Sequence, residues 1–148
     1  MILHVLGTAQ DGGYPHADCH KKCCASVWDS PELQRLPTSI AVIDQTQNKF
    51  YLFDITPNIK QQLHRLKDYN CELAGIFITH AHIGHYLGLM DLGLEIMNTN
   101  NIPVHIMPKM KNFILNNQPM TQLIENNNIR LIELQNNQNI LFNNLSVT

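Results

Sequence analysis

The chain has few charged side chains. They make up 15% of its 148 residues, and 10 basic against 12 acidic residues leave a formal net charge of −2. No stretch concentrates lysine and arginine, so the sequence does not support binding to a nucleic acid, which depends on clustered positive charge. The hydrophobic share of 44% excludes a disordered or fibrous chain. We expect a single globular domain over residues 1–148.

Long apolar runs are also missing. No segment approaches the roughly 20 apolar residues of a membrane span, so we expect no membrane partner. The first residues, MILHVLGTAQDGG, lack the basic start of a signal peptide, and His4 interrupts their apolar run. A cytoplasmic protein is therefore expected, with its few cysteines as thiols rather than disulfides. These cysteines are Cys19, Cys23, Cys24 and Cys71.

Short apolar segments predict strands in the first part of the chain. ILHVLGT is one such segment, and SIAVID and KFYLFDI around the turn QTQN predict a hairpin. A short helix is expected near Ala25 to Ser30. Thr56 followed by a proline is typical of a helix start, which predicts a helix from about Pro57 to Lys67.

Strand and helix patterns alternate in the second part. AGIFIT is a continuous apolar run, as in a central strand covered on both faces. Residues Tyr86 to Met97 predict a largely buried helix, and Pro108 to Asn116 a short one after the strand VHIM. IRLIEL and ILF predict a second hairpin around QNNQ. This order favours an α/β layered fold. The final NNLSVT has the pattern of a strand that has only begun, so we expect a domain truncated at its C-terminus.

Three histidines, His80, His82 and His85, follow the apolar strand segment in ITHAHIGH. Imidazoles bind zinc, iron or copper when several converge. In an extended segment His80 and His82 point to the same side, and α/β sheets bind ligands beyond the carboxyl ends of their strands. A lone histidine would be ordinary polar surface. Three in this position predict a metal site.

The segment THAHIGHYLGLM resembles the His-x-His-x-Asp-His motif of the metallo-β-lactamase superfamily, and YLFDITP resembles that superfamily's third-strand acidic turn. Together with GTAQDGGYPHADCHKKCC, the histidine segment is similar to the branch related to coenzyme PQQ synthesis protein B. The resemblance implies an αββα sandwich, of which this chain is the N-terminal half. It also implies hydrolysis of a small-molecule substrate by a metal-activated water. An iron-dependent oxygenase and a non-catalytic half-domain are the alternatives.

Gly84 departs from the family motif. The resemblance assigns the first two motif histidines to one metal, and the aspartate and third histidine to a second. His80 and His82 then match the first metal position and His85 the second, while Gly84 replaces the aspartate. We therefore expect one catalytic metal, zinc, with iron or manganese as alternatives.

Asp11, in the glycine-rich loop after the first strand, is our candidate for the missing carboxylate, alone or with His16. A turn role for Asp11 beside two glycines is the competing interpretation. The histidine ligands that the superfamily places later in the chain have no match, since His105 is the sole histidine beyond the motif and lies within a predicted strand.

The loop PHADCHKKCC contains Cys19, Cys23 and Cys24 together with His16 and His20. Thiolates and imidazoles in a short loop suit a structural zinc, which would hold a loop poor in apolar anchors. Plain reduced cysteines are an equal alternative.

Two further points stay open at this stage. Asp54 ends a predicted strand, and it either caps the next helix or forms a hydrogen bond to a metal-bound histidine. The exposed sheet edges of a half-domain favour self-association, unless the missing half covers them.

Overall fold

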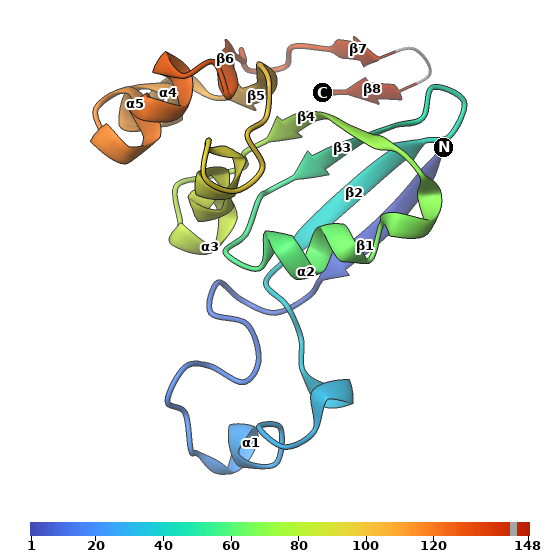
Figure 1. Cartoon of the computed structure of the whole chain (residues 1–148), viewed down its shortest axis with the longest axis vertical. Helices are drawn as coiled ribbons and strands as arrows, with labels where there is room; N and C mark the ends of the chain where they lie inside the picture. Colours follow the sequence, from blue (N-terminus) through green and yellow to red (C-terminus); the bar gives the residue numbers. More distant parts are fainter. Residues whose placement is uncertain (143–144) are drawn as a thin grey trace.

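Six strands form a mixed sheet whose spatial order is also the chain order (Figure 1). The computed structural model describes residues 1–142 and 145–148. The strands are β1 (Ile2–Gly7), β2 (Ser39–Asp44), β3 (Lys49–Phe53), β4 (Glu72–Phe77), β5 (Ile102–Ile106) and β6 (Ile129–Glu133). β1, β2 and β3 pair antiparallel, and β3 to β6 pair parallel. β7 (Ile140–Phe142) and β8 (Leu145–Val147) form a separate antiparallel pair.

Helices cover one face of this sheet and bury the core against it. They are α2 (Ile59–His64), α3 (Ile83–Tyr86), α4 (Pro108–Leu115) and α5 (Gln118–Glu125), with the 3-10 turns η2 (Lys67–Tyr69) and η3 (Leu87–Leu92). Leu52 and Ile76 of the sheet pack in one cluster with Ile59, Leu92 and Ile114, and each of these five is at most 1% exposed. The core holds the ends of β3 and β4 in place, and these strand ends carry the candidate site.

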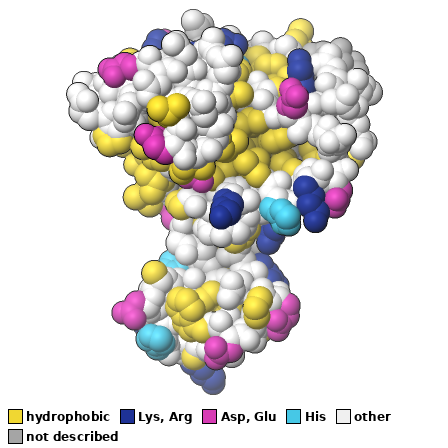
Figure 2. Space-filling view, viewed as in Figure 1, with side chains coloured by type: hydrophobic (Ala, Val, Ile, Leu, Met, Phe, Trp, Pro, Cys, Tyr) yellow, Lys and Arg dark blue, Asp and Glu magenta, His cyan; other side chains and the backbone are white. Residues whose placement is uncertain are grey.

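The segment between β1 and β2 projects away from the sheet as a separate lobe (Figures 1 and 2). It contains α1 (Lys22–Ala25) and the turn η1 (Pro31–Leu33). Backbone hydrogen bonds from Thr8 and Ala9 to the carbonyl of Leu36, each 3.0 Å long, tie its two ends together. The two ends of the lobe therefore lie side by side, next to the ends of β1 and β2.

The other face of the sheet exposes apolar side chains. Leu3 is 65% exposed and Val5 49%, although both lie in a strand. An apolar hollow of about 400 Å³ runs over this face beside Leu3, Val42 and Phe53. In the described ranges, none of the helices has the length and apolarity that crossing a bilayer requires.

Several predicted elements are confirmed. β2 and β3 form the expected hairpin, β4 lies between two strands, and α4 begins at the expected proline. The helix predicted from Pro57 is confirmed in its position but begins only at Ile59. The αββα fold class is addressed below with the comparisons.

Three predictions of local structure are wrong. The helix expected over 86–97 is α3 followed by a 3-10 turn that ends at Leu92, because Gly88 lets this turn press against the backbone of Ile55 and Thr56. IRLIEL and ILF do not form a hairpin, since β6 extends the parallel sheet beside β5 and β7 pairs with β8. The helix expected near 25–30 is α1, which ends at Ala25.

Helix α5 has no counterpart among the elements predicted from the sequence. Pro119 in its first turn, with Met120 and Leu123 on its buried side, was the signal available in the sequence.

Candidate metal centre

The three motif histidines lie together just beyond the carboxyl end of β4. The imidazole centroid of His80 is 4.6 Å from that of His82 and 4.1 Å from that of His85. His80 and His82 are exposed, whereas the side chain of His85 is 15% exposed. The fold therefore places the rings where the sequence predicted a ligand site, at the carboxyl end of a central strand.

Asp54, the residue just after β3, is hydrogen-bonded to this cluster. Its side chain is 7% exposed and its φ of 64° is left-handed, a conformation that aspartate tolerates better than most residues. The carboxylate accepts hydrogen bonds from Nδ1 of His85 at 2.7 Å and from the backbone N–H of Thr79 at 2.8 Å. The capping role is wrong, because α2 has Asn58 as its N-cap and no side-chain cap. Asp54 instead supports the histidines.

These hydrogen bonds decide which imidazole nitrogens face outward. A carboxylate only accepts, so we assign the proton of His85 to Nδ1, which leaves the lone pair on Nε2. The Thr79 hydroxyl lies 2.9 Å from both oxygens of Asp54 and donates to that carboxylate. It can then accept from Nδ1 of His80, 2.8 Å away. Both histidines thus present Nε2, in the protonation state that a metal ligand needs.

Asp11 reaches the same cluster from the projecting loop. Its Oδ1 is 3.5 Å from Nε2 of His85, and its Oδ2 accepts a 3.3 Å hydrogen bond from the N–H of Gly84. Partial burial by itself raises the pKa of Asp11, but backbone hydrogen bonds and the nearby His85 and His82 outweigh it and lower the pKa. Asp11 is therefore a carboxylate beside the motif. His16 is exposed, with its ring over Gly12.

The cysteine sulfurs of the projecting lobe converge. The ligand atoms of Cys19, Cys23 and Cys24 all lie within 4.8 Å of one another, and within residues 1–142 and 145–148 no other group of possible ligands meets that spacing. Trp28 Nε1 donates to the carbonyl of Cys19 at 2.8 Å, and the Tyr14 hydroxyl donates to that of Cys23. The donor set fits a thiolate-bound metal. At the histidine cluster the side chains would have to close in on an ion.

Comparisons with known proteins bear on both groups. No protein-family model matches the chain. It is similar to coenzyme PQQ synthesis protein B of Klebsiella pneumoniae, with 28% identity over 101 residues that make up 62% of this chain and 32% of the relative. The corresponding protein of Methylobacterium nodulans is 29% identical over 103 residues, 62% of this chain and 33% of that one. The chain thus spans about a third of the length of the curated relatives it matches.

Solved structures match a larger share of this chain than the curated relatives do. Zn²⁺-bound PqqB of Methylobacterium extorquens superposes with a TM-score of 0.78 at 19% identity, covering 93% of this chain and 47% of its own. A diphosphatase of the PhnP family gives a TM-score of 0.73 at 24% identity, covering 97% and 54%. The chain has a metallo-β-lactamase-like fold. Human tRNase Z, short form, is a more distant match, with a TM-score of 0.52 at 19% identity, covering 88% of this chain and 44% of that chain.

The metallo-β-lactamase-like fold confirms the predicted fold class. The structural neighbours are about twice as long as the matched region, since this chain covers 47% and 54% of the first two. The metal-binding role of the individual side chains stays a prediction.

His105 lies apart from the metal centre, as expected from its place within β5. It is 6% exposed, and its ring stacks on Phe77 with centroids 4.5 Å apart. Burial lowers the pKa of His105, and the positive charge of Arg130 lowers it further. Neither ring nitrogen has a hydrogen-bond partner among the described residues. His105 is therefore a neutral core residue.

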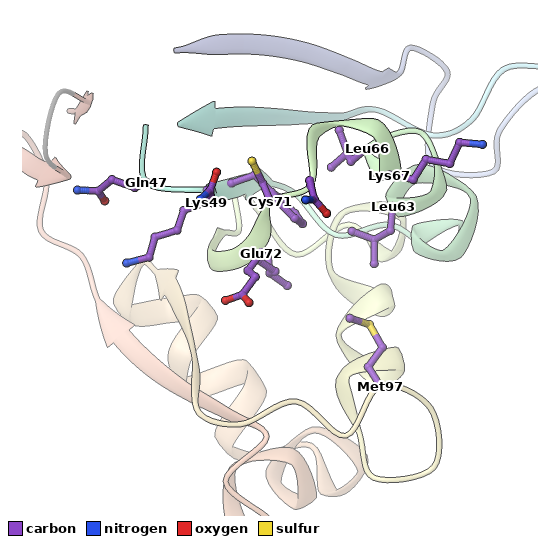
Figure 3. A pocket seen from close by; sticks show the side chains of 12 residues that line it. Gln47, Lys49, Leu63, Leu66, Lys67, Cys71, Glu72 and Met97 are labelled. Atoms are coloured by element: carbon purple, nitrogen blue, oxygen red, sulfur yellow. The ribbon is translucent and has the colours of Figure 1, made fainter. Parts of the chain in front are cut away.

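A hollow of about 750 Å³ lies at the opposite, amino ends of β3 and β4 (Figure 3). Leu63 and Met97 contribute to its apolar wall, and the amino groups of Lys49 and Lys67 point in different directions rather than converging. Because the two lysine amino groups do not converge on a common point, we assign no ligand to this hollow. It belongs to the surface between α2 and the loop after η3.

Proposed function

We propose that this chain carries the histidine metal site of a metal-dependent hydrolase. His80, His82 and His85 would hold the ion, and zinc is the metal we expect, because the solved structure of PqqB that resembles this chain is Zn²⁺-bound. The observation that carries the proposal is the hydrogen-bond network of Asp54, which turns Nε2 of His80 and His85 outward. An ordinary surface histidine has no need of such a buried carboxylate.

When bound, the metal supplies Lewis acidity and a water whose pKa is lowered to near neutrality. The residues of this chain orient the histidines and form the surface around them. Asp54 holds the tautomer of His85 and, through the Thr79 hydroxyl, that of His80. Ile83 is 56% exposed between two of the site histidines and offers an apolar surface to a substrate. The substrate is expected to be a small molecule.

We propose a separate structural zinc for the cysteine loop. The convergence of Cys19, Cys23 and Cys24 supports it, as do the hydrogen bonds that Tyr14 and Trp28 make to the cysteine carbonyls. This lobe has little apolar core of its own, so a metal would supply the cross-link that packing does not.

Elemental analysis of the purified chain tests both sites. We expect the His80→Ala/His82→Ala variant to lose the metal of the histidine site and keep that of the cysteine loop. Cys19→Ser/Cys23→Ser should do the reverse. His64→Ala, which removes an exposed histidine on α2, is the matched control and should change neither.

Metal content that is unchanged in the double histidine variant would contradict the proposed hydrolase site. Iron retained at the histidine site, with oxygen consumption, would identify an oxygenase instead. If the metal is zinc, hydrolysis of chromogenic phosphodiesters and lactones by the metal-loaded chain is the next assay, with the double histidine variant as its blank.

A further inference from the structure

We propose that Asp11 and Gly84 are an exchanged pair, in which the loop carboxylate of Asp11 takes the place of the missing motif aspartate and forms a second metal position with His85. This inference rests on the proposed function, because it assumes that the histidine cluster binds metal. It raises the expected number of metals at the cluster from one to two.

The first support is the position of the carboxylate. Asp11 lies 73 residues from Gly84 in the sequence, yet its Oδ2 accepts a hydrogen bond from the Gly84 N–H. Its Oδ1 faces Nε2 of His85, the outward nitrogen of that ring. The carboxylate thus lies beside both the residue that occupies the aspartate position and the histidine that would share its metal.

The second support is steric. A Cβ atom added to Gly84 would overlap the backbone Cα of Asp11 and lie 2.6 Å from its Cβ and 2.9 Å from its Cγ, far inside van der Waals contact. Gly84 is buried, and its φ lies outside the left-handed region, so its backbone does not itself require glycine. What requires glycine is the space that Asp11 fills. A side chain at 84 and the present position of Asp11 exclude each other.

The loop cannot easily move out of the way. The Thr38 N–H and hydroxyl both donate to the carbonyl of Ala9, at 2.9 and 2.8 Å. On the other side of Asp11, the N–H of Tyr14 donates to the carbonyl of Arg35 at 2.8 Å. Asp11 is therefore held at Gly84 by contacts on both sides of it along the chain.

The third support is electrostatic. His85 already donates Nδ1–H to Asp54, so its Nε2 lone pair faces the Asp11 carboxylate at 3.5 Å, which is longer than a direct hydrogen bond. Two acceptors in this arrangement repel each other unless a cation or a second proton on His85 joins them. A divalent cation bound by both is the account that fits the neighbouring His80 and His82.

Cobalt titration of the purified apoprotein tests the exchange. Thiolate-to-cobalt charge transfer marks metal in the cysteine loop, whereas d–d bands alone mark the nitrogen and oxygen ligands of the histidine cluster. We expect two cobalt equivalents at the cluster in the wild type and one in Asp11→Asn. The lost equivalent should bind more than about 100-fold more weakly, beyond the effect of losing an outer hydrogen-bond partner.

The reciprocal variant makes the test specific. Asp11→Gly/Gly84→Asp removes the contacts with Cβ and Cγ of Asp11, but the Cα of residue 11 still overlaps the new Cβ, so this variant recovers the second equivalent only where the loop shifts. Gly84→Asp alone should bind only one equivalent, because the new side chain and that of Asp11 cannot occupy the same space. Asp29→Asn removes an exposed carboxylate of the same lobe and is the control. Circular dichroism and the urea midpoint of each variant report whether it folds.

The outcomes separate this inference from the proposed function. If His80→Ala/His82→Ala loses cobalt but Asp11→Asn keeps both equivalents, the exchange is wrong and Asp11 is not a metal ligand. If neither variant loses cobalt at the cluster, both the exchange and the proposed function are wrong.

Discussion

Asp54 offers the sharpest test of how the fold prepares the histidines. Its carboxylate accepts from His85 Nδ1 and from both the N–H and the hydroxyl of Thr79, and the residue is 5% exposed. Asp54→Asn keeps the shape and the tolerance for a positive φ, but its amide offers one acceptor oxygen where the carboxylate has two. The amide can still accept from the Thr79 N–H, yet it presents a donor or a poorer acceptor to His85.

The expected cost follows from the hydrogen bonds lost. Losing the charge-assisted bond to His85 should lower the free energy of unfolding of the apoprotein by about 2 to 3 kcal/mol. Asp54→Ala should lower it by a further ~1 to 2 kcal/mol, because alanine in a left-handed conformation is strained. The affinity for metal at the histidine cluster should fall roughly 10- to 100-fold in Asp54→Asn, as for other groups that orient a ligand.

Two measurements are needed on each variant: urea unfolding of the metal-free protein and zinc affinity by competition with a chromophoric chelator. Asp44→Asn is the matched control, because Asp44 is a carboxylate, 4% exposed, at the end of β2 and bonds to Thr46. We expect it to lose stability without losing zinc affinity at the cluster. If Asp54→Asn behaves like Asp44→Asn, Asp54 is a structural residue only and the tautomer assignment is refuted.

Three further predictions concern the rest of the fold. Gly88→Ala should lower the free energy of unfolding by about 1 to 3 kcal/mol, because its Cβ would lie 2.9 Å from the backbone carbon of Thr56; urea midpoints unchanged from the wild type would contradict this. Burial lowers the pKa of His105, so on acidification the imidazole is protonated in the unfolded chain at a higher pH than in the folded chain. The free energy of unfolding therefore falls as the pH drops through about 6.5. Urea titrations between pH 7 and 5 should show a flatter dependence in His105→Phe, and an identical slope would count against a buried neutral imidazole. Leu3→Lys should reduce self-association through the apolar sheet face, measured by size-exclusion chromatography over a concentration series, and elution that matches the wild type would argue against that face as the contact.

Local sequence patterns determined much of the framework. The QTQN turn between two apolar segments predicted the β2–β3 hairpin, and the unbroken run AGIFIT predicted a central strand. Pro108 marked the start of α4. The three histidines could be chosen as a candidate metal site because their spacing and their place after a strand lie within one short segment. Each of these signals depends on residues close together in the chain.

Only the tertiary structure decided how the site is completed. Asp54 and His85 are 31 residues apart and Asp11 and Gly84 are 73 apart, and no periodicity in the sequence links either pair. Their contacts depend on the register of β3 beside β4 and on the return of the loop after β1. The partner of β6 was decided in the same way, by a strand edge that local pattern does not encode. The candidate metal ligands could be chosen from the sequence, whereas the hydrogen bonds and close contacts between them exist only once the sheet has formed.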